Sequence, residues 1–363
     1  MKLQVTQENL SKALSSVGRV ASTRGTLPIL SNVLLKTVGT RLSIAATNLD
    51  IAITHYIGSK VAEEGSITVP ARLMQDFVGS LPGGVIDLTL EDNKLHVSTD
   101  QYNSTINGVS AEDYPVMPAI DGGVTWTISA KALKSGLQQV IGAASNDEAR
   151  PVLTGVYVHS HEGKVYLVAT DSYRLAEKIL PASSDEINLL IPANALQDLL
   201  RIVSDHDEDV TVTHDDQQVL FKVGDVELVT RLIEGKYPDY RKLIPKDFAS
   251  SATLKRSDFV NITKVSSLFA RESAGSVTIR LDDATGQVSI RSVASQLGEN
   301  TASADAQVTG EGTITLNSRY ILDALGALGG DQVTFSFNGK LEPCVLADPA
   351  ASDYLHVIMP LKS

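Results

Sequence analysis

An internal repeat of about 123 residues constrains the fold of this chain more than any other feature of the sequence. Two runs of apolar residues share the i, i+3, i+4, i+7, i+11 spacing of a helix that buries one face. The first run is Leu10, Ala13, Leu14, Val17 and Ala21, and the second is Leu133, Gly136, Leu137, Val140 and Ala144. A third, more diverged copy keeps Phe259, Ile262 and Ala270, with the polar Thr263 and Ser266 between them. A repeat of this length predicts several similar structural units rather than one large core.

Each copy also contains a second predicted helix. These helices begin near Val69-Pro70-Ala71-Arg72, Ile191-Pro192-Ala193-Asn194 and Leu316-Asn317-Ser318-Arg319. Proline fits the first turn of a helix, where its missing N–H has no partner to lose, and Asn or Ser can cap that turn. Alternating strand-like sequence follows each helix, at residues 85–90, 210–213 and 333–337. We therefore predict an α+β fold of three similar domains, each with two helices against antiparallel sheets, at residues 1–121, 122–246 and 247–363.

Composition and charge limit the classes of function. Hydrophobic residues make up 43% of the chain and charged residues 20%, as in a folded globular protein. No apolar run is long enough for a membrane span and the N-terminus lacks a signal peptide, so we expect a cytoplasmic protein without a membrane partner. The single cysteine, Cys344, can form neither an internal disulfide nor a thiolate metal cluster. The net charge of −12 requires any DNA-binding function to concentrate its cations on one surface.

One acidic stretch could suggest an enzyme. The residues Asp205-His206-Asp207-Glu208-Asp209, together with His214-Asp215-Asp216, include groups used in metal binding and acid–base catalysis. They fall between predicted strands, where a solvated loop explains them equally well. The sequence has no Gly-rich phosphate loop, HExxH pair or Cys/His cluster. We therefore expect no catalysis, no cofactor and no metal.

Four segments give the chain a family resemblance. They are Thr26–Asn32, Val168–Ala176, Gly235–Pro245 and Val357–Leu361. In this order and at these distances they resemble bacterial DNA polymerase sliding clamps, the beta subunits of DNA polymerase III, over the whole chain. The resemblance implies a subunit that forms half of a closed ring, pairs head to tail in a homodimer and encircles duplex DNA without sequence specificity. It also implies two kinds of protein partner, a clamp loader and the polymerases and repair proteins that the ring tethers.

Sliding requires phosphate contacts that exchange freely with counterions, so Lys and Arg on pore-lining helices are the candidates for DNA binding. The candidates are Lys12, Arg24, Arg72, Arg150 and Arg201. Arg24, Arg72 and Arg150 match basic positions of the family, whereas Ala193 and Asn194 stand where relatives often carry basic residues. An alternative is that these are ordinary solvated helix charges, with Arg72–Asp76 or Arg319–Asp323 forming pairs four residues apart.

The resemblance also implies a pocket that binds short peptides of partner proteins. The matching positions are Leu153, Thr170, Ser172, Tyr173, Arg174, Leu175, Pro238, Lys242, Leu243, Val357, Met359, Pro360 and Leu361. Relatives commonly have small or imidazole side chains where Ser172 and Tyr173 lie, and often Arg in place of Lys242. The subunit interface is expected to pair Ile106 with Leu268 and Phe269. Two alternatives remain: these apolar residues could be plain core, and the chain could be a peptide-binding scaffold without DNA.

Overall fold

The computed structural model of the chain describes residues 1–21, 27–120, 122–181, 187–296 and 298–361. Contacts divide it into two compact units, each with its own sheets. Unit 1 consists of Met1–Lys131 with Asp198–Leu232, and unit 2 consists of Ala132–Gln197 with Ile233–Ser363. No helix among the described residues is long and apolar enough to cross a membrane.

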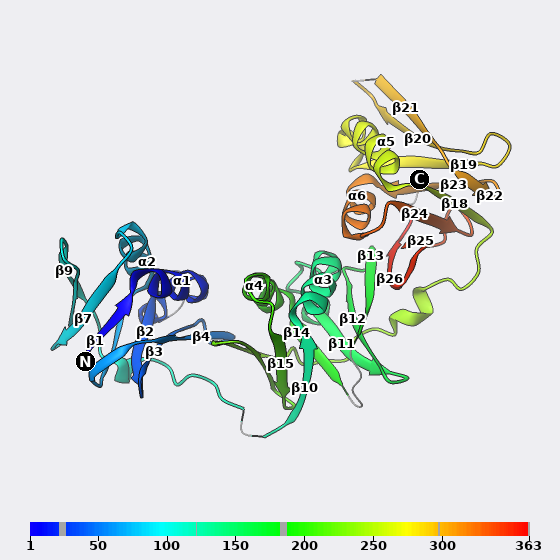
Figure 1. Ribbon diagram of the computed structural model, residues 1–363. Helices are drawn as coiled ribbons and strands as arrows, with labels where there is room; N and C mark the ends of the chain where they lie inside the picture. The colour runs from blue at the N-terminus through cyan, green and yellow to red at the C-terminus, as the bar shows by residue number, and fades with distance from the viewer. Residues whose placement is uncertain (22–26, 121, 182–186, 297, 362–363) are drawn as a thin grey trace. The chain divides into compact units, whose positions relative to one another are not determined.

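The described residues contain six α-helices, two for each copy of the repeat. The first helices of the copies are α1 (Gln7–Val17), α3 (Ala130–Val140) and α5 (Arg256–Phe269). The second helices are α2 (Ala71–Ser80), α4 (Ala193–Ser204) and α6 (Ser318–Ala327). The apolar stripe of α1 is buried, and α1 packs against α2 as α5 packs against α6 (Figure 1). Short 3-10 helices add η1 (Pro28–Ser31), η2 (Ala111–Asp113), η3 (Ile141–Ala143), η4 (Pro151–Leu153), η5 (Tyr240–Leu243) and η6 (Arg271–Ser273).

Unit 1 contains two antiparallel sheets. The five-stranded sheet has the order β5 (Lys60–Glu63), β1 (Lys2–Thr6), β7 (Val85–Glu91), β8 (Lys94–Ser98), β9 (Asn103–Asn107). The eight-stranded sheet has the order β10 (Val124–Ser129), β15 (Asp209–His214), β16 (Gln218–Val223), β17 (Val226–Arg231), β4 (Ile51–Gly58), β3 (Arg41–Thr47), β2 (Asn32–Val38), β6 (Ser66–Pro70).

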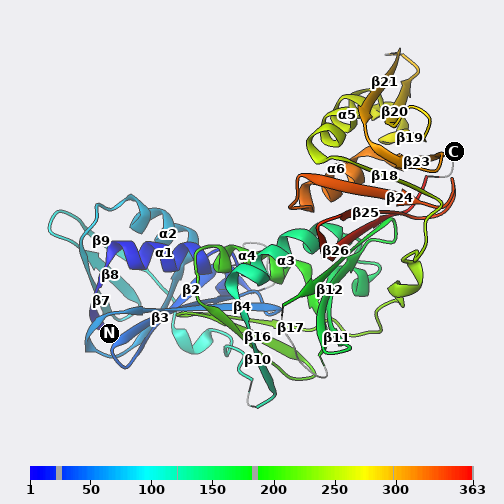
Figure 2. The ribbon, with the colours of Figure 1, turned by 45° about the vertical axis from the view of Figure 1, so that its right-hand side comes forward.

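Unit 2 also contains two antiparallel sheets, and its strands β24, β25 and β26 run side by side in Figure 2. The nine-stranded sheet has the order β14 (Asn188–Pro192), β11 (Gly155–His161), β12 (Lys164–Thr170), β13 (Arg174–Leu180), β26 (Ala351–Ile358), β25 (Cys344–Asp348), β24 (Gln332–Phe337), β18 (Ser250–Lys255), β22 (Gln307–Thr309). The four-stranded sheet has the order β21 (Gly298–Asp305), β20 (Gln287–Ala294), β19 (Ser276–Asp282), β23 (Gly312–Asn317).

Strands from neighbouring copies of the repeat pair with each other in the same way twice. In unit 1, β17 pairs antiparallel with β4, with Thr230 opposite Ile51. In unit 2, β26 pairs antiparallel with β13, with Ile358 opposite Arg174. The positions 51 and 174 are separated by the repeat interval, so the two junctions are equivalent. Backbone hydrogen bonds therefore join successive copies into continuous sheets.

The helix starts follow local hydrogen-bonding rules, with one difference from the sequence expectation. Thr6 and Asn317 cap α1 and α6 by accepting hydrogen bonds from the backbone N–H groups of Asn9 and Arg319. The two prolines expected in a first turn instead precede their helices, since Pro70 ends β6 before α2 and Pro192 ends β14 before α4. The strand thus runs directly into the helix.

The diverged helix α5 buries the polar residues that interrupt its apolar stripe. Thr263 and Ser266 are both fully buried. The Thr263 hydroxyl donates to the carbonyl of Phe259 at 2.7 Å, and Asn300 on β21 donates to the Ser266 hydroxyl at 3.0 Å. Because each hydroxyl has a partner, the helix tolerates polar residues on its buried face.

Candidate functional sites

The turn between β12 and β13 holds the centre of the expected peptide site. The Thr170 hydroxyl donates to the carbonyl of Arg174 at 2.6 Å and accepts from the N–H of Ser172 at 3.1 Å. The Asp171 carboxylate accepts from the N–H groups of Tyr173 and Arg174, both at 2.9 Å. These bonds hold Ser172 in the left-handed region, with φ of 78°. As a result Tyr173 projects outward with 58% of its surface exposed.

The Arg174 guanidinium forms ion pairs within the protein and is not a free surface charge. Its Nη1 lies 2.5 Å from Asp323 Oδ2 on α6, and its Nε lies 3.1 Å from Asp171 Oδ2. The guanidinium also lies over the ring of Tyr320, 4.6 Å from the ring centroid. Only 11% of the side chain is exposed. Arg174 therefore links β13 to α6 and is not available to a ligand without losing these partners.

Arg150 lies beside the peptide site although it was expected to contact DNA. Its Nη1 donates to the Ser172 hydroxyl at 3.0 Å, and its Nε lies 2.9 Å from Asp147 Oδ2. The Asp147 carboxylate has a pKa below its usual value, because it accepts hydrogen bonds from Arg150 and from the N–H of Ala149. The structure thus brings together two residues that the sequence analysis assigned to different sites.

The other expected peptide-site residues fall into a buried and an exposed group. Leu153, Thr170, Leu175 and Val357 are buried, so they support the surface from below. The Met359 N–H donates to the carbonyl of Tyr173 at 2.8 Å, which fixes the C-terminal segment against the turn. We name the accessible part the docking surface: Ser172, Tyr173, Pro238, Lys242 and Leu243, with the half-buried Met359, Pro360 and Leu361. Lys242 pairs with Asp239 at 2.7 Å but remains 80% exposed.

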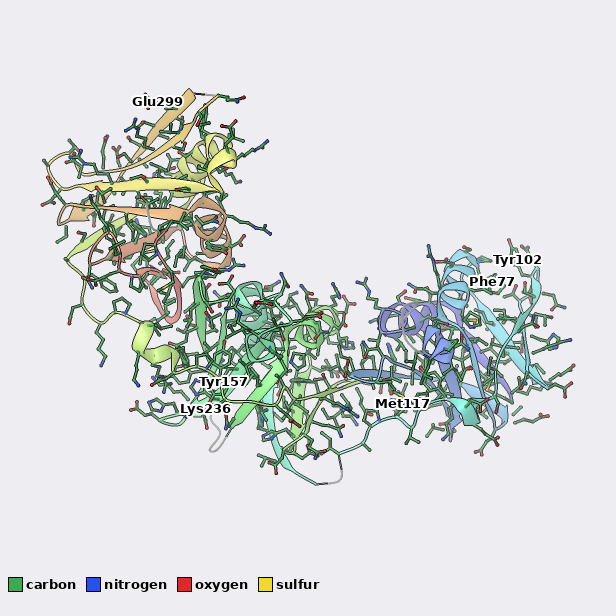
Figure 3. All side chains as sticks on the ribbon, turned by 180° about the vertical axis from the view of Figure 1, so that it is seen from behind. Phe77, Tyr102, Met117, Tyr157, Lys236 and Glu299 are labelled. Atoms are coloured by element: carbon green, nitrogen blue, oxygen red, sulfur yellow. The ribbon has the colours of Figure 1, made fainter. Side chains whose placement is uncertain are left out.

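A stack of aromatic side chains supports this surface. The His159 ring lies between Tyr157 and Tyr166, with centroid distances of 4.6 and 5.2 Å. Its Nε2 lies 2.9 Å from the hydroxyl of Tyr240, and Tyr157 also stacks on Tyr237 at 4.9 Å. Figure 3 shows Tyr157 near Lys236, which precedes Tyr237 in the chain. Burial lowers the pKa of His159 to about 4, so the ring is neutral at physiological pH.

A cavity in unit 1 contains two of the expected DNA-binding residues, Lys12 and Arg201. It has a volume of about 380 Å³ and is lined by Lys12 of α1, Arg19 in the turn after α1, Arg201 of α4 and the carboxylates of Asp198 and Asp205. Arg201 pairs with Asp198 at 2.6 Å, and burial raises the pKa of that carboxyl. His55 also lines the cavity but is neutral, because burial lowers its pKa to about 4. Arg19 lies in the turn that follows the end of α1 at Val17.

The remaining predicted DNA-binding residues lie elsewhere. Arg72 on α2 has a side chain that is 90% exposed and only a distant pair with Asp76, at 3.9 Å. Arg319 forms no ion pair with Asp323 in the described part of the chain, since Asp323 pairs with Arg174. Arg24 lies outside the described residues.

The expected interface residues and the acidic loop are accessible to different degrees. Ile106 on β9 is 5% exposed, whereas Leu268 near the end of α5 is 51% exposed and Phe269 is half-buried. In the acidic segment, Asp215 closes a hairpin by accepting from the N–H groups of Gln217 and Gln218. Among the described residues no group of three or more His, Cys, Asp or Glu is placed to hold a metal ion.

Comparison with known proteins agrees with this architecture along the whole chain. Family models for the DNA polymerase III beta subunit match at residues 1–118 (N-terminal domain), 127–239 (central domain) and 241–362 (C-terminal domain). The "Beta sliding clamp" of Synechococcus elongatus is 32% identical, with 100% of this chain and 99% of the relative covered.

Solved structures show the same fold. The DNA polymerase sliding clamp of Bacillus subtilis has a TM-score of 0.95 and 28% identity, covering 100% of this chain and 99% of that one. A sliding clamp of Pseudomonas aeruginosa bound to griselimycin has a TM-score of 0.95 and 26% identity, covering 100% of both chains. The fold is thus that of DNA sliding clamps.

This chain belongs to the beta sliding clamp family, the family of the DNA polymerase III beta subunit. The membership confirms the resemblance predicted from sequence and the expected role as a DNA sliding clamp, a replication factor that is not itself catalytic.

Proposed function

We propose that two copies of this chain join head to tail into a ring that surrounds duplex DNA, as the family resemblance implies. The proposal rests on two strands at sheet edges, β9 and β21. Among the described residues, each lacks the strand partner that the equivalent strands in the other copies of the repeat have. Strands β4 and β13 each pair with a strand of the next copy of the repeat, and β21 is their equivalent in the last copy. Strand β9 is likewise the first-copy equivalent of β17 and β26. Both β9 and β21 end their sheets with only one strand partner in the described chain.

An antiparallel pairing of β9 with β21 of a second copy would repeat the junction seen inside each unit. Unpaired strand edges expose N–H and C=O groups that favour such pairing. The exposed Leu268 belongs to α5, the helix that packs against β21. Two such junctions form a closed ring if the rotation from one copy to the next adds up to a full turn, and the resemblance implies that two copies suffice.

We also propose that the chain has three domains, at residues 1–121, 122–246 and 247–363.

Within the ring, cationic helix faces would attract the DNA backbone without reading its sequence. Lys12, Arg19 and Arg201 converge on one cavity, and Arg72 is almost wholly exposed. Such phosphate contacts attract the duplex but exchange with counterions, which permits sliding. Retention then comes from encirclement, so a net charge of −12 is no obstacle.

The docking surface would bind short segments of partner proteins, among them the clamp loader, the replicative polymerase and repair proteins. We expect the protein to do this in the cytoplasm. Exposed Tyr173 and Leu243 offer apolar contact beside the charged Lys242. Tyrosine gives a large contact area at a low cost in conformational entropy, which suits a surface shared by several partners.

Light scattering with mass determination tests the assembly. The expected mass is twice the 38.7 kDa of the chain. Leu268→Asp places a charge on the proposed interface and should give the monomer mass, while Leu73→Asp, at an equally exposed site on α2, should leave the dimer intact. A monomeric wild-type protein, or a dimer unaffected by Leu268→Asp, would contradict the proposed interface.

A further inference from the structure

We propose that unit 1 carries a second peptide-binding site, which takes the C-terminal residue of a peptide with an apolar side chain. The site is a cavity of about 270 Å³ at the junction of β4 and β17, next to the segment after Tyr114. The inference extends the docking function proposed above, because the cavity occupies the position in unit 1 that the docking surface occupies in unit 2.

The turn that borders this cavity repeats the turn of the docking surface bond for bond. The Thr47 hydroxyl donates to the carbonyl of Ile51 at 2.9 Å and accepts from the N–H of Leu49 at 3.0 Å. The Asn48 side chain accepts from the N–H groups of Asp50 and Ile51, at 3.1 and 2.8 Å. These are the bonds made by Thr170 and Asp171 at an interval of 123 residues.

The same equivalence extends to the backbone conformation and to the neighbouring strand. Leu49 has φ of 80°, matching the 78° of Ser172. A left-handed conformation is unusual for leucine and is typical of places where function fixes the backbone. The N–H of Arg231 donates to the carbonyl of Asp50 at 3.1 Å, as Met359 does to Tyr173. Pro115 and Pro238, which each follow a buried tyrosine, complete the correspondence.

The lining of the cavity offers apolar contact that the chain itself leaves uncovered. Val116 is 95% exposed and Leu49 is 46% exposed, while Val229 forms part of the floor. Apolar side chains that gather at a concave site mark a place where a ligand can be bound. The volume suits one or two side chains of a peptide rather than a drug-sized ligand, because typical ligand pockets start at about 300 Å³.

Three polar groups at the cavity identify the kind of ligand. The Oε1 atom of Gln218 is buried and has no hydrogen-bond partner among the described residues. The Arg231 guanidinium forms no ion pair in the described part of the chain, and the Asp50 carboxylate is exposed beside it. The last two residues of a peptide supply matching groups: a terminal carboxylate for Arg231 and two backbone N–H donors for Gln218 and Asp50. In unit 2 the position of Arg231 is taken by Met359, so the two sites should differ in their need for a free carboxylate.

Methyl NMR on the full-length protein tests the second site separately from the docking surface. The probe is the peptide acetyl-Gly-Gly-Leu-Leu with a free C-terminal carboxylate, compared with its C-terminal amide. Methyl signals of Leu49, Val116 and Val229 report on unit 1, and those of Leu243 and Leu361 report on unit 2. We expect the acid to shift the unit 1 signals and the amide to bind there about threefold more weakly, as for loss of an exposed charge pair.

Two variants and a control assign the response. Val116→Asp and Arg231→Gln should weaken the shifts in unit 1, and Val38→Asp, at an exposed site away from the cavity, should not. Unit 1 signals that stay fixed in the wild-type protein would overturn the second site whatever happens at Leu243 and Leu361. Equal binding of acid and amide in unit 1 would overturn the assignment to a peptide C-terminus. The docking surface of unit 2 is tested independently by the Tyr173 variant discussed below.

Discussion

Arg174 at the start of β13 reaches Asp323 on α6, with 2.5 Å between Nη1 and Oδ2. The two residues are 149 positions apart and belong to different copies of the repeat. The same guanidinium also pairs with Asp171, which shapes the turn that presents Tyr173. The docking surface is therefore connected to the junction between the second and third copies through one side chain.

Removing this guanidinium should destabilise the protein. Arg174→Ala removes the ion pair of Asp171 and leaves the Asp323 carboxylate without its ion-pair partner, and we expect a loss of about 1–3 kcal/mol in the free energy of unfolding. Denaturant unfolding of Arg174→Ala, Asp323→Asn and the double variant measures the coupling between the two residues. Arg319→Ala is the control, since this exposed residue should change stability by less than about 0.5 kcal/mol. Additive effects of the two single changes would show that the pair contributes nothing.

Stability should fall as the pH is lowered from about 6.5. Burial, together with the nearby charge of Arg174, lowers the pKa of His356 to about 3. For His55 the main cause is also burial, which lowers its pKa to about 4. At pH values between these lowered pKa values and about 6.5, the unfolded chain binds protons at the two histidines that the folded chain does not bind. Acid therefore favours unfolding. Between pH 6.5 and 5 the contribution of one such histidine is about 2 kcal/mol.

His356→Gln should flatten this dependence by about that amount, because the titrating group is gone while an amide can still meet the Tyr354 hydroxyl. Denaturant midpoints measured at several pH values give the slope, and His161→Gln at an exposed site should not change it. A slope that His356→Gln leaves as steep as in the wild type would show that His356 does not account for it.

DNA affinity should depend on salt through the exposed helix cations. If Arg72 contacts a phosphate, Arg72→Ala should reduce the slope of log affinity against log salt by about 1. Fluorescence anisotropy with a short labelled duplex measures that slope, and Lys164→Ala, at the tip of the β11–β12 hairpin, is the control. Equal slopes for wild type and Arg72→Ala would remove Arg72 from the DNA-binding surface.

The docking surface should lose affinity when its exposed aromatic side chain is removed. Tyr173→Ala should weaken binding of polymerase-derived peptides by about tenfold, the effect of losing an interfacial tyrosine. Deletion of residues 359–363 should abolish that binding while the dimer survives. Calorimetric titration measures both, and Tyr102→Ala, a similarly exposed tyrosine in unit 1, should bind as the wild type does. Unchanged affinity in the Tyr173 variant would show that Tyr173 is not part of the peptide-binding site.

The periodic elements of the fold could be predicted from the sequence, because burial imposes a spacing on the apolar residues. Leu10, Ala13, Leu14 and Val17 lie buried in α1 as predicted, whereas Ala21, the fifth residue of the predicted stripe, lies beyond the end of α1. The diverged α5 was harder to predict from apolar spacing, because Thr263 and Ser266 are buried by hydrogen bonds that apolar patterns do not reveal. The pairing of β4 with β17 was also missed, since strand alternation indicates a buried face but not a partner.

The sequence predicted which residues belong to the candidate site but not which partners their side chains contact. Arg174 and Arg150 were assigned to ligand contacts, yet their guanidinium groups are engaged by Asp323 and by Ser172. Both interactions join residues far apart in the chain, and a single sequence carries no signal for them. The repeat interval did contain usable information: it relates Thr47 to Thr170, and the equivalence of their turns follows directly.

Retention on circular and on linear DNA shows whether the protein encircles the duplex. Protein placed by a clamp loader on a nicked circular duplex should remain bound through gel filtration at a salt concentration that removes backbone-bound proteins. Cutting the same circle with a restriction enzyme should release it, because only the closed path of the DNA holds the ring. Equal loss from circular and linear DNA, or equal retention on both, would contradict encirclement.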